Sequence, residues 1–255
     1  HFGVVGPDFT KRNDFVISDK DNHACIVAGT LMTKGAMGGL VRYKHNDMDD
    51  LEKTISKLPA ESGKLIVSDG VFSTGGEIVE LPRMIEIAKK YGARVMIDDA
   101  HSVGVIGKGG RGTASEFSLE KDVDLTMGTF SKTFASLGGF VAGTERVINF
   151  IKHFSPALIF SASPTPASVA SALAALDILE AHPELVTRLL SNANYMRTNL
   201  KARGFNVIEG RTAIVPVIVG DDAIAFQMWK LLYDNGVFVN VFISPGVPPG
   251  RQMMR

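Results

Sequence analysis

Lys132 is the residue whose surroundings point most directly to chemistry, because it follows a short predicted strand in a Gly-Thr-Phe-Ser-Lys segment. A lysine amine can form an imine only when it is held in place and partly deprotonated. The pKa of a free lysine is about 10.4, so such a site needs desolvation or a cationic neighbour. Lys132 alone would be taken for an ordinary surface residue, since most lysines are solvated.

Asp98 changes that interpretation, because it ends a hydrophobic segment, where a carboxylate is costly unless it is paired. A pyridoxal 5′-phosphate (PLP) enzyme requires a carboxylate facing the pyridine nitrogen, which keeps the ring protonated and able to accept electrons. His101, three residues later, could donate a hydrogen bond to the phenolic oxygen of PLP. The alternatives are structural roles for both residues, or half of a Mg²⁺ site at Asp98 and Asp99, for which the sequence shows no partner acids. We expect no metal.

Three other patterns fit their motifs poorly. The glycine-rich run at 104–112 lacks the dinucleotide-binding spacing, and the segment at 128–133 lacks the glycine that precedes the lysine of a phosphate-binding loop. A Ser-x-x-Lys acylase would need serine where Thr129 stands, and the sequence has no Gly-x-Ser-x-Gly hydrolase elbow.

The elements that must position these residues alternate along the chain. Strands are predicted at 14–18, 40–43, 64–68, 94–98, 124–127 and 139–142, and helices at 22–34, 48–58 and 81–91. Asn22 is expected to cap the first helix and Gly92 to end the third. Repeated strand–helix units favour a mostly parallel sheet between helices, whose ligands lie at the carboxyl ends of the strands. Ser68 with Asp69, Asp98 with His101, and Lys132 follow such ends.

The pattern changes after residue 160. Helices are predicted at 166–181, 183–203 and 223–235, and strands at 213–219 and 237–240. We therefore expect a large α/β domain over 1–160, followed over 161–255 by a bridging helix and a smaller α+β domain. Residues 154–176 carry no charge and are long enough to span a bilayer, but three prolines and five serines favour a buried loop leading into a helix.

Composition excludes some partners. The chain has 27 basic and 27 acidic residues and 45% hydrophobic residues, so it shows neither a nucleic-acid footprint nor a polybasic membrane surface. Cys25 is the single cysteine, which rules out an intrachain disulfide and favours a reducing cytoplasm. No signal-peptide pattern follows His1.

The order of these segments resembles the α-oxoamine synthases, which are fold-type I PLP enzymes. The resemblance rests on Asp-Asp-Ala-His-Ser-Val-Gly from Asp98, Gly-Arg-Gly from Gly110, Gly-Thr-Phe-Ser-Lys from Gly128, Gly-Gly at 138–139 and the 34-residue separation of Asp98 and Lys132. It implies an α/β fold with a mostly parallel, seven-stranded-type sheet. The N-terminal arm, with its phosphate loop, and the C-terminal end of the small domain are expected to fall outside this sequence.

The resemblance implies four catalytic residues. Lys132 would carry PLP as a Schiff base, Asp98 would pair with the pyridinium nitrogen, and His101 would lie beside the phenolic oxygen. His23, in an Asp-Asn-His-Ala segment, would stack on the ring and help to hold the amino-acid carboxylate.

Four further residues resemble binding positions. Ser73 would lie near the phenolic oxygen, Thr129 would bind the phosphate, and Ser161 would reach the phosphate across the interface of a homodimer. Arg255 would pair with the substrate carboxylate, a task that suits a bidentate guanidinium.

The activity implied is the decarboxylative Claisen condensation of a small α-amino acid with an acyl-CoA, which releases an α-amino ketone, CoA and CO₂. Residues 122–125, 135–143 and 161–163 look closest to bacterial serine palmitoyltransferases of sphingolipid synthesis. An 8-amino-7-oxononanoate synthase of biotin synthesis, using alanine and a pimeloyl thioester, and a glycine C-acetyltransferase remain alternatives. A non-catalytic partner subunit is the non-enzyme alternative, and such subunits lack the lysine that Lys132 supplies.

Overall fold

A computed structural model describes residues 13–31 and 39–255 and divides them into two compact units. The larger unit comprises the described residues up to Phe72 together with Ile78–Pro183, and the smaller unit comprises Ser73–Glu77 and Glu184–Arg255. The division after Pro183 differs from the boundary we expected at residue 160. Helix α8 (Pro166–Ala181) stays with the larger unit, where its Ser168 carbonyl accepts a 2.6 Å hydrogen bond from Ser136 Oγ.

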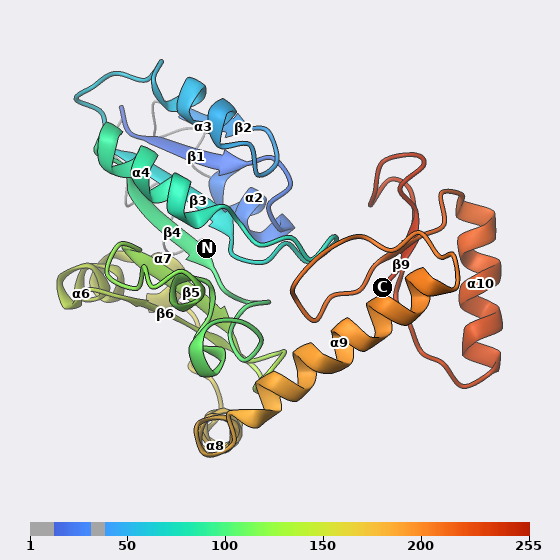
Figure 1. The fold of residues 1–255 in the computed structure, drawn as a ribbon. Helices are drawn as coiled ribbons and strands as arrows, with labels where there is room; N and C mark the ends of the chain where they lie inside the picture. The colour runs from blue at the N-terminus through green and yellow to red at the C-terminus, as the bar shows by residue number, and fades with distance from the viewer. Residues whose placement is uncertain (1–12, 32–38) are drawn as a thin grey trace. The chain divides into compact units, whose positions relative to one another are not determined.

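The larger unit is built on a mixed sheet in the order β2-β1-β3-β4-β5-β6, and the first five strands in this order are parallel (Figure 1). Strand β6 pairs antiparallel with β5 at one edge. The strand bounds are β1 Phe15–Asp19, β2 Gly39–Tyr43, β3 Lys64–Asp69, β4 Arg94–Asp98, β5 Leu125–Thr129 and β6 Gly139–Gly143. The mostly parallel α/β fold is confirmed, with six strands in the described part.

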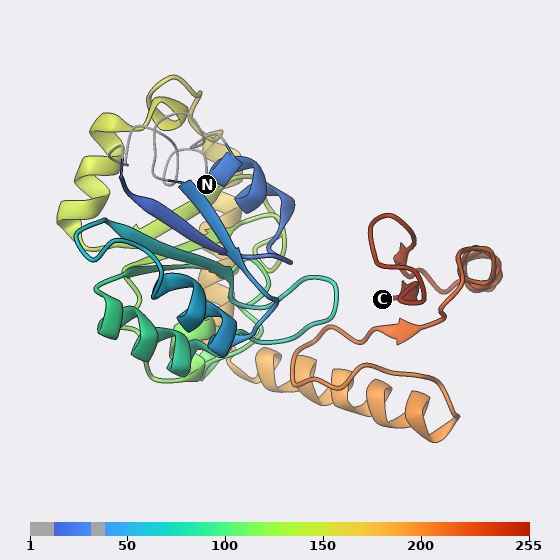
Figure 2. The same cartoon turned by 90° about the horizontal axis from the view of Figure 1, so that it is seen from above.

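Alternating residues of the strands supply two cores, one on each face of the sheet. Ile17, Ile66 and Ile97 pack with α3 (Met48–Ile55) and α4 (Leu81–Tyr91). Their neighbours in sequence, including Val16, Val67 and Met96, pack with α2 (Ala24–Leu31) and α6 (Glu145–Phe154) on the other face (Figure 2). This two-residue period fits a sheet covered by helices on both sides.

Helix boundaries follow local chemistry. Asp47 caps α3 by accepting a hydrogen bond from Asp50 N, and Gly92 ends α4 in the left-handed region at φ 63°. Thr165 caps α8 from its side chain, with Pro166 at the first helical position. Asn22 does not act as the expected cap, because its side chain is engaged in the sheet, as described below.

The segment before α8 contradicts the expected buried loop. It forms α6, the short helix α7 (Pro156–Ile159) and an exposed stretch in which Phe160 is 86% exposed. The loop after β4 holds η3 (Lys108–Gly110) and α5 (Thr113–Glu116). Across the described residues, every helix is too short or too polar to cross a bilayer.

The smaller unit combines α9 (Glu184–Ala202) and α10 (Asp222–Asp234) with an antiparallel sheet in the order β7-β9-β8. These strands are Val217–Ile218, Met253–Met254 and Val241–Phe242, and Val217, Ala225 and Met254 are buried in its core. Strand β7 is shorter than the predicted 213–219 because Pro216 has no amide hydrogen for a ladder. The strand predicted at 237–240 is wrong, because these residues are not in a strand and β8 begins directly after them at Val241.

Candidate active site

Polar residues gather where the parallel strands of the larger unit end. Asp19, Asp69, Asp98 and Thr129 are the last residues of β1, β3, β4 and β5. In the register, Asp69 lies beside Asp98, and Asp98 lies beside Met127, two residues before Thr129. The carboxyl edge of the sheet therefore brings together strand ends that are up to 110 positions apart in the sequence, as expected for parallel strands.

Asp98 is 2% exposed at the end of β4, and its Oδ1 accepts a 2.9 Å hydrogen bond from Ala100 N. Its backbone is fixed on both sides, since Gly70 N donates to Asp98 O at 2.8 Å and Asp99 N donates to Met127 O at 2.7 Å. A buried carboxylate held this rigidly can stabilise a cationic ring nitrogen without reorganising.

Asp99, next to Asp98, is a buried acid to which the sequence assigned no role. Both of its oxygens accept from Thr113 N, at 3.3 and 3.1 Å, and Ser102 also bonds to the carboxyl group. Burial nevertheless raises the pKa of Asp99 to about 6. Gly112, at φ 94°, packs so closely that a Cβ there would lie 2.2 Å from Asp99 Oδ2. Asp99 thus ties together the loop that begins with His101.

Lys132 is exposed in the turn between β5 and β6. Its carbonyl accepts from Ala135 N at 3.0 Å, and Phe130 N donates to Gly138 O at 3.0 Å. The next residue, Thr133, donates from Oγ1 to Val103 O at 2.8 Å. This bond joins the Lys132 turn to the loop that carries the half-buried His101, so the structure brings the two segments into contact.

Thr129 lies at the carboxyl edge of the sheet, whereas Ser161 bonds locally after α7. Thr129 Oγ1 donates to Gly138 O at 3.2 Å and lies 2.9 Å from Ser131 Oγ, which places both hydroxyls beside the Lys132 turn. Ser161 is exposed after α7, and its Oγ donates to Ala157 O at 2.5 Å. Within this chain Ser161 is therefore engaged locally rather than with the strand ends.

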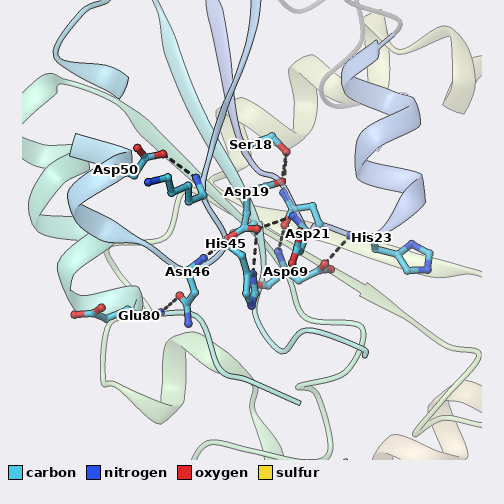
Figure 3. A network of polar contacts seen from close by, with 12 residues as sticks. Ser18, Asp19, Asp21, His23, His45, Asn46, Asp50, Asp69 and Glu80 are labelled. Carbon is cyan, nitrogen blue, oxygen red and sulfur yellow. Dashed lines mark hydrogen bonds and ion pairs between the residues drawn. The ribbon is translucent and has the colours of Figure 1, made fainter. Parts of the chain in front are cut away.

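His23 stands directly before α2, and Asp69 fixes its backbone. His23 N donates to Asp69 Oδ2 at 2.7 Å, and the imidazole projects away from the network of strand-end carboxylates (Figure 3). Asn22 Oδ1 accepts from Asp69 N at 2.9 Å. Asp69 and Asn22 were not predicted as site residues, although Asp69 was noted at a strand end and Asn22 adjoins His23.

Ser73 and Arg255, both assigned by resemblance, meet in the smaller unit. Arg255 donates from Nη1 to Ser73 O, and its guanidinium lies 4.8 Å from the centre of the Phe242 ring. Partial burial lowers the pKa of the Arg255 guanidinium below its ordinary value. The loop at Ser73–Glu77 is thereby held to the residue expected to bind a carboxylate.

The donor set of the larger unit fits PLP rather than a metal. It offers a buried carboxylate, an exposed amine, an imidazole and two hydroxyls, which match a pyridinium nitrogen, an aldehyde, a flat ring and a phosphate. No group of three or more His, Cys, Asp or Glu within residues 13–31 and 39–255 is arranged to hold a metal ion.

Known proteins resemble the chain along nearly its whole length. Serine palmitoyltransferase of Sphingobacterium spiritivorum is 48% identical over 244 residues, which are 96% of this chain and 60% of that protein. The 8-amino-7-oxononanoate synthase of Fervidobacterium nodosum is 41% identical over 250 residues, which are 97% of this chain and 62% of that protein. A solved structure of SPT with PLP internal aldimine matches with a TM-score of 0.94 at 37% identity, covering 100% of this chain and 64% of the other.

The chain thus spans roughly three fifths of the length of these relatives. Their names confirm the resemblance to the α-oxoamine synthases, and the matched structure confirms the fold. A model of the aminotransferase class I and II family matches residues 12–254. The chain therefore belongs to the aminotransferase class I and II family.

Proposed function

We propose that the protein is a PLP-dependent acyltransferase that condenses a small α-amino acid with an acyl-CoA. A carbon–carbon bond forms between the amino-acid α-carbon and the thioester carbonyl, CoA leaves as the thiol, and the carboxylate leaves as CO₂. The observation that carries the proposal is the placement of buried Asp98 on β4 beside β5, the strand that leads into the Lys132 turn.

Each residue has a role that suits the chemistry of its side chain. When bound, PLP supplies an electron sink for the negative charge that develops on the substrate α-carbon. Asp98 holds a proton on the ring nitrogen, because a buried carboxylate strongly favours a cation beside it. Lys132 binds the cofactor through its amine and then moves the α-proton of the substrate. His101 donates to the phenolic oxygen.

The remaining residues bind and orient. Thr129 supplies a hydroxyl to the cofactor phosphate, and Ser73 adds a contact near the phenolic oxygen. His23 stacks on the ring and shares the substrate carboxylate with Arg255. A guanidinium has five N–H donors, so Arg255 can pair with a carboxylate while one of them is used by Ser73 O.

A homodimer is part of the proposal, with Ser161 reaching the phosphate of the other subunit. It is supported by the apolar surface over α7 and α8, where Leu158, Phe160 and Leu173 are 53%, 86% and 58% exposed. Large apolar side chains that are exposed within one short stretch of the chain are what a protein interface would cover. The single cysteine fits a cytoplasmic setting.

Serine with a long-chain acyl-CoA is the preferred substrate pair, because the relative named serine palmitoyltransferase is 48% identical and the one named 8-amino-7-oxononanoate synthase 41%. Alanine with a pimeloyl thioester is the second candidate, and glycine with acetyl-CoA the third. The presence of Lys132 disfavours an inactive partner subunit.

The test is a titration of the full-length protein, loaded with PLP, against serine, alanine and glycine. The absorbance of the bound cofactor should change with serine at the lowest concentration, and palmitoyl-CoA should then release free CoA thiol. Lys132→Ala should abolish CoA release. Full turnover by Lys132→Ala would refute the assignment, and a preference for alanine with pimeloyl-CoA would select the second candidate.

A further inference from the structure

We propose that His23 is presented with its proton on Nε2, and that Cys25, Asp69 and Asn22 are the positioning residues that hold it in this form. The inference deepens the proposed function, because it states which atom of His23 can donate to the substrate. Its test does not depend on turnover, so the two can fail separately.

The backbone of His23 is held by a buried clamp between β1 and β3. Asn22, 7% exposed, donates from Nδ2 to Ser18 Oγ at 2.9 Å and to Val67 O at 2.8 Å. Its Oδ1 accepts from Asp69 N at 2.9 Å, and Asp69 Oδ2 in turn accepts from His23 N at 2.7 Å (Figure 3). Each buried polar atom of this clamp has a partner, so the start of α2 has little freedom to move.

The ring of His23 is oriented by Cys25. Cys25 N donates to His23 Nδ1 at 3.3 Å, and Cys25 Sγ lies 2.9 Å from the same nitrogen. A backbone amide is only a donor, so Nδ1 must act as the acceptor. In a neutral imidazole one nitrogen accepts and the other carries the proton, which places the proton on Nε2.

The fixed tautomer decides which ring nitrogen of His23 can donate to a ligand. With Nδ1 occupied from its own helix, Nε2–H is the donor left for a ligand carboxylate or for a ring oxygen. The neutral side chain can therefore donate one directed hydrogen bond without carrying charge. Cys25 acts through His23 alone and is therefore a positioning residue.

The experiment is nitrogen NMR of the full-length protein labelled with ¹⁵N-histidine, recorded with and without PLP at a pH where the imidazole is neutral. His23→Gln assigns the signal by its loss. We expect an unprotonated Nδ1 and a protonated Nε2. His153 is an internal control of opposite sign, because its Nδ1 lies 2.7 Å from Asn149 O and must donate to that carbonyl.

The variants separate the parts of the clamp. Cys25→Ser keeps a side-chain donor and should keep the Nε2–H form, whereas Cys25→Ala should weaken the preference roughly fivefold, the factor that one neutral hydrogen bond supplies. Asp69→Asn keeps an acceptor for His23 N, and Asp69→Ala removes it and should broaden or split the signal. Asp124→Ala is the matched control. The Asp124 carboxylate also accepts from a backbone amide, Val95 N at 2.9 Å, but it lies at the amino ends of the strands, so its loss should leave the His23 signal unchanged.

A wild-type His23 protonated on Nδ1 would overturn the assigned tautomer. A tautomer ratio that Cys25→Ala leaves unchanged would overturn the role of the Cys25 side chain, because this variant keeps the backbone amide that donates to Nδ1. If the tautomer is as expected but no amino acid perturbs bound PLP, the proposed function fails and the positioning of His23 stands. If both hold, Cys25→Ala should raise KM for the amino acid about fivefold, Cys25→Ser should restore it, and kcat should change less.

Discussion

Replacing Asp99 by asparagine should stabilise the protein, relative to wild type, increasingly as the pH rises from 5 to 7.5. Asp99 is 1% exposed, and burial of its carboxyl group raises the pKa to about 6. Asparagine has nearly the same shape and keeps an oxygen that can accept from Thr113 N. It differs chiefly in carrying no charge at any pH.

The sign follows from proton linkage. Because the pKa of folded Asp99 lies above its ordinary value of 3.8, the native state binds the proton more tightly than the unfolded chain between those values. Stability is therefore lost as the pH rises through this window. The full penalty is about 3 kcal/mol at roughly 1.4 kcal/mol per pH unit. About 1.5 kcal/mol of it develops between pH 5 and 7.5.

The assay is calorimetry of wild type, Asp99→Asn and Asp99→Ala at matched pH values. The contributions of the other ionisable groups to the pH dependence of Tm cancel when the Tm of wild type is subtracted at the same pH. The Tm of Asp99→Asn minus that of wild type should rise by about 2–5 °C over the pH range. Asp99→Ala should be less stable throughout, since it leaves Thr113 N without its acceptor, but should show the same slope. A difference that is independent of pH, or that grows toward acid, would refute the reasoning.

Three further variants test other parts of the structure. Gly112→Ala should cost at least about 2 kcal/mol in urea unfolding, because it combines a positive φ with a clash against Asp99, whereas Gly109→Ala, with φ 62° and open space around it, should cost only about 1 kcal/mol. If the proposed homodimer forms through α8, Leu173→Asp on the exposed face of this helix should give a monomer in light scattering, and a dimeric mass for the variant would place the interface elsewhere. Arg255→Lys should raise KM for the amino acid about tenfold with a smaller change in kcat, and equal losses in both would argue against carboxylate binding.

Periodicity and end signals located most of the sheet and helices of the larger unit. Arg94–Asp98 and Leu81–Tyr91 were placed to the residue, because a buried strand and a glycine-terminated helix carry strong local signals. The prediction of a buried loop at 154–165 was wrong. An uncharged sequence fits an exposed apolar surface as well as a buried loop, so composition alone could not separate the two. In the structure, residues 161–183 belong to the larger unit, and the exposed apolar α8 gives no sign in the sequence of the unit to which it belongs.

The strand-end rule located Asp98, Asp69 and the Lys132 turn at one edge of the sheet. The rule could not predict the hydrogen bonds that hold these residues in place. The Thr133–Val103 bond, the Asn22–Asp69 clamp and the burial of Asp99 join positions that are between 14 and 47 residues apart. Such pairings depend on the register of neighbouring strands, which the composition of a single strand does not encode.

Chemical trapping identifies the amine that binds the cofactor in the proposed enzyme. The full-length protein would be loaded with PLP, reduced with borohydride, digested and examined by mass spectrometry. We expect a reduced pyridoxyl adduct on Lys132, and its loss when Asp98→Ala removes the ring-nitrogen partner or Lys132→Ala removes the amine. An adduct confined to other lysines, or no adduct on the wild type, would refute the assignment of Lys132 as the cofactor-binding residue.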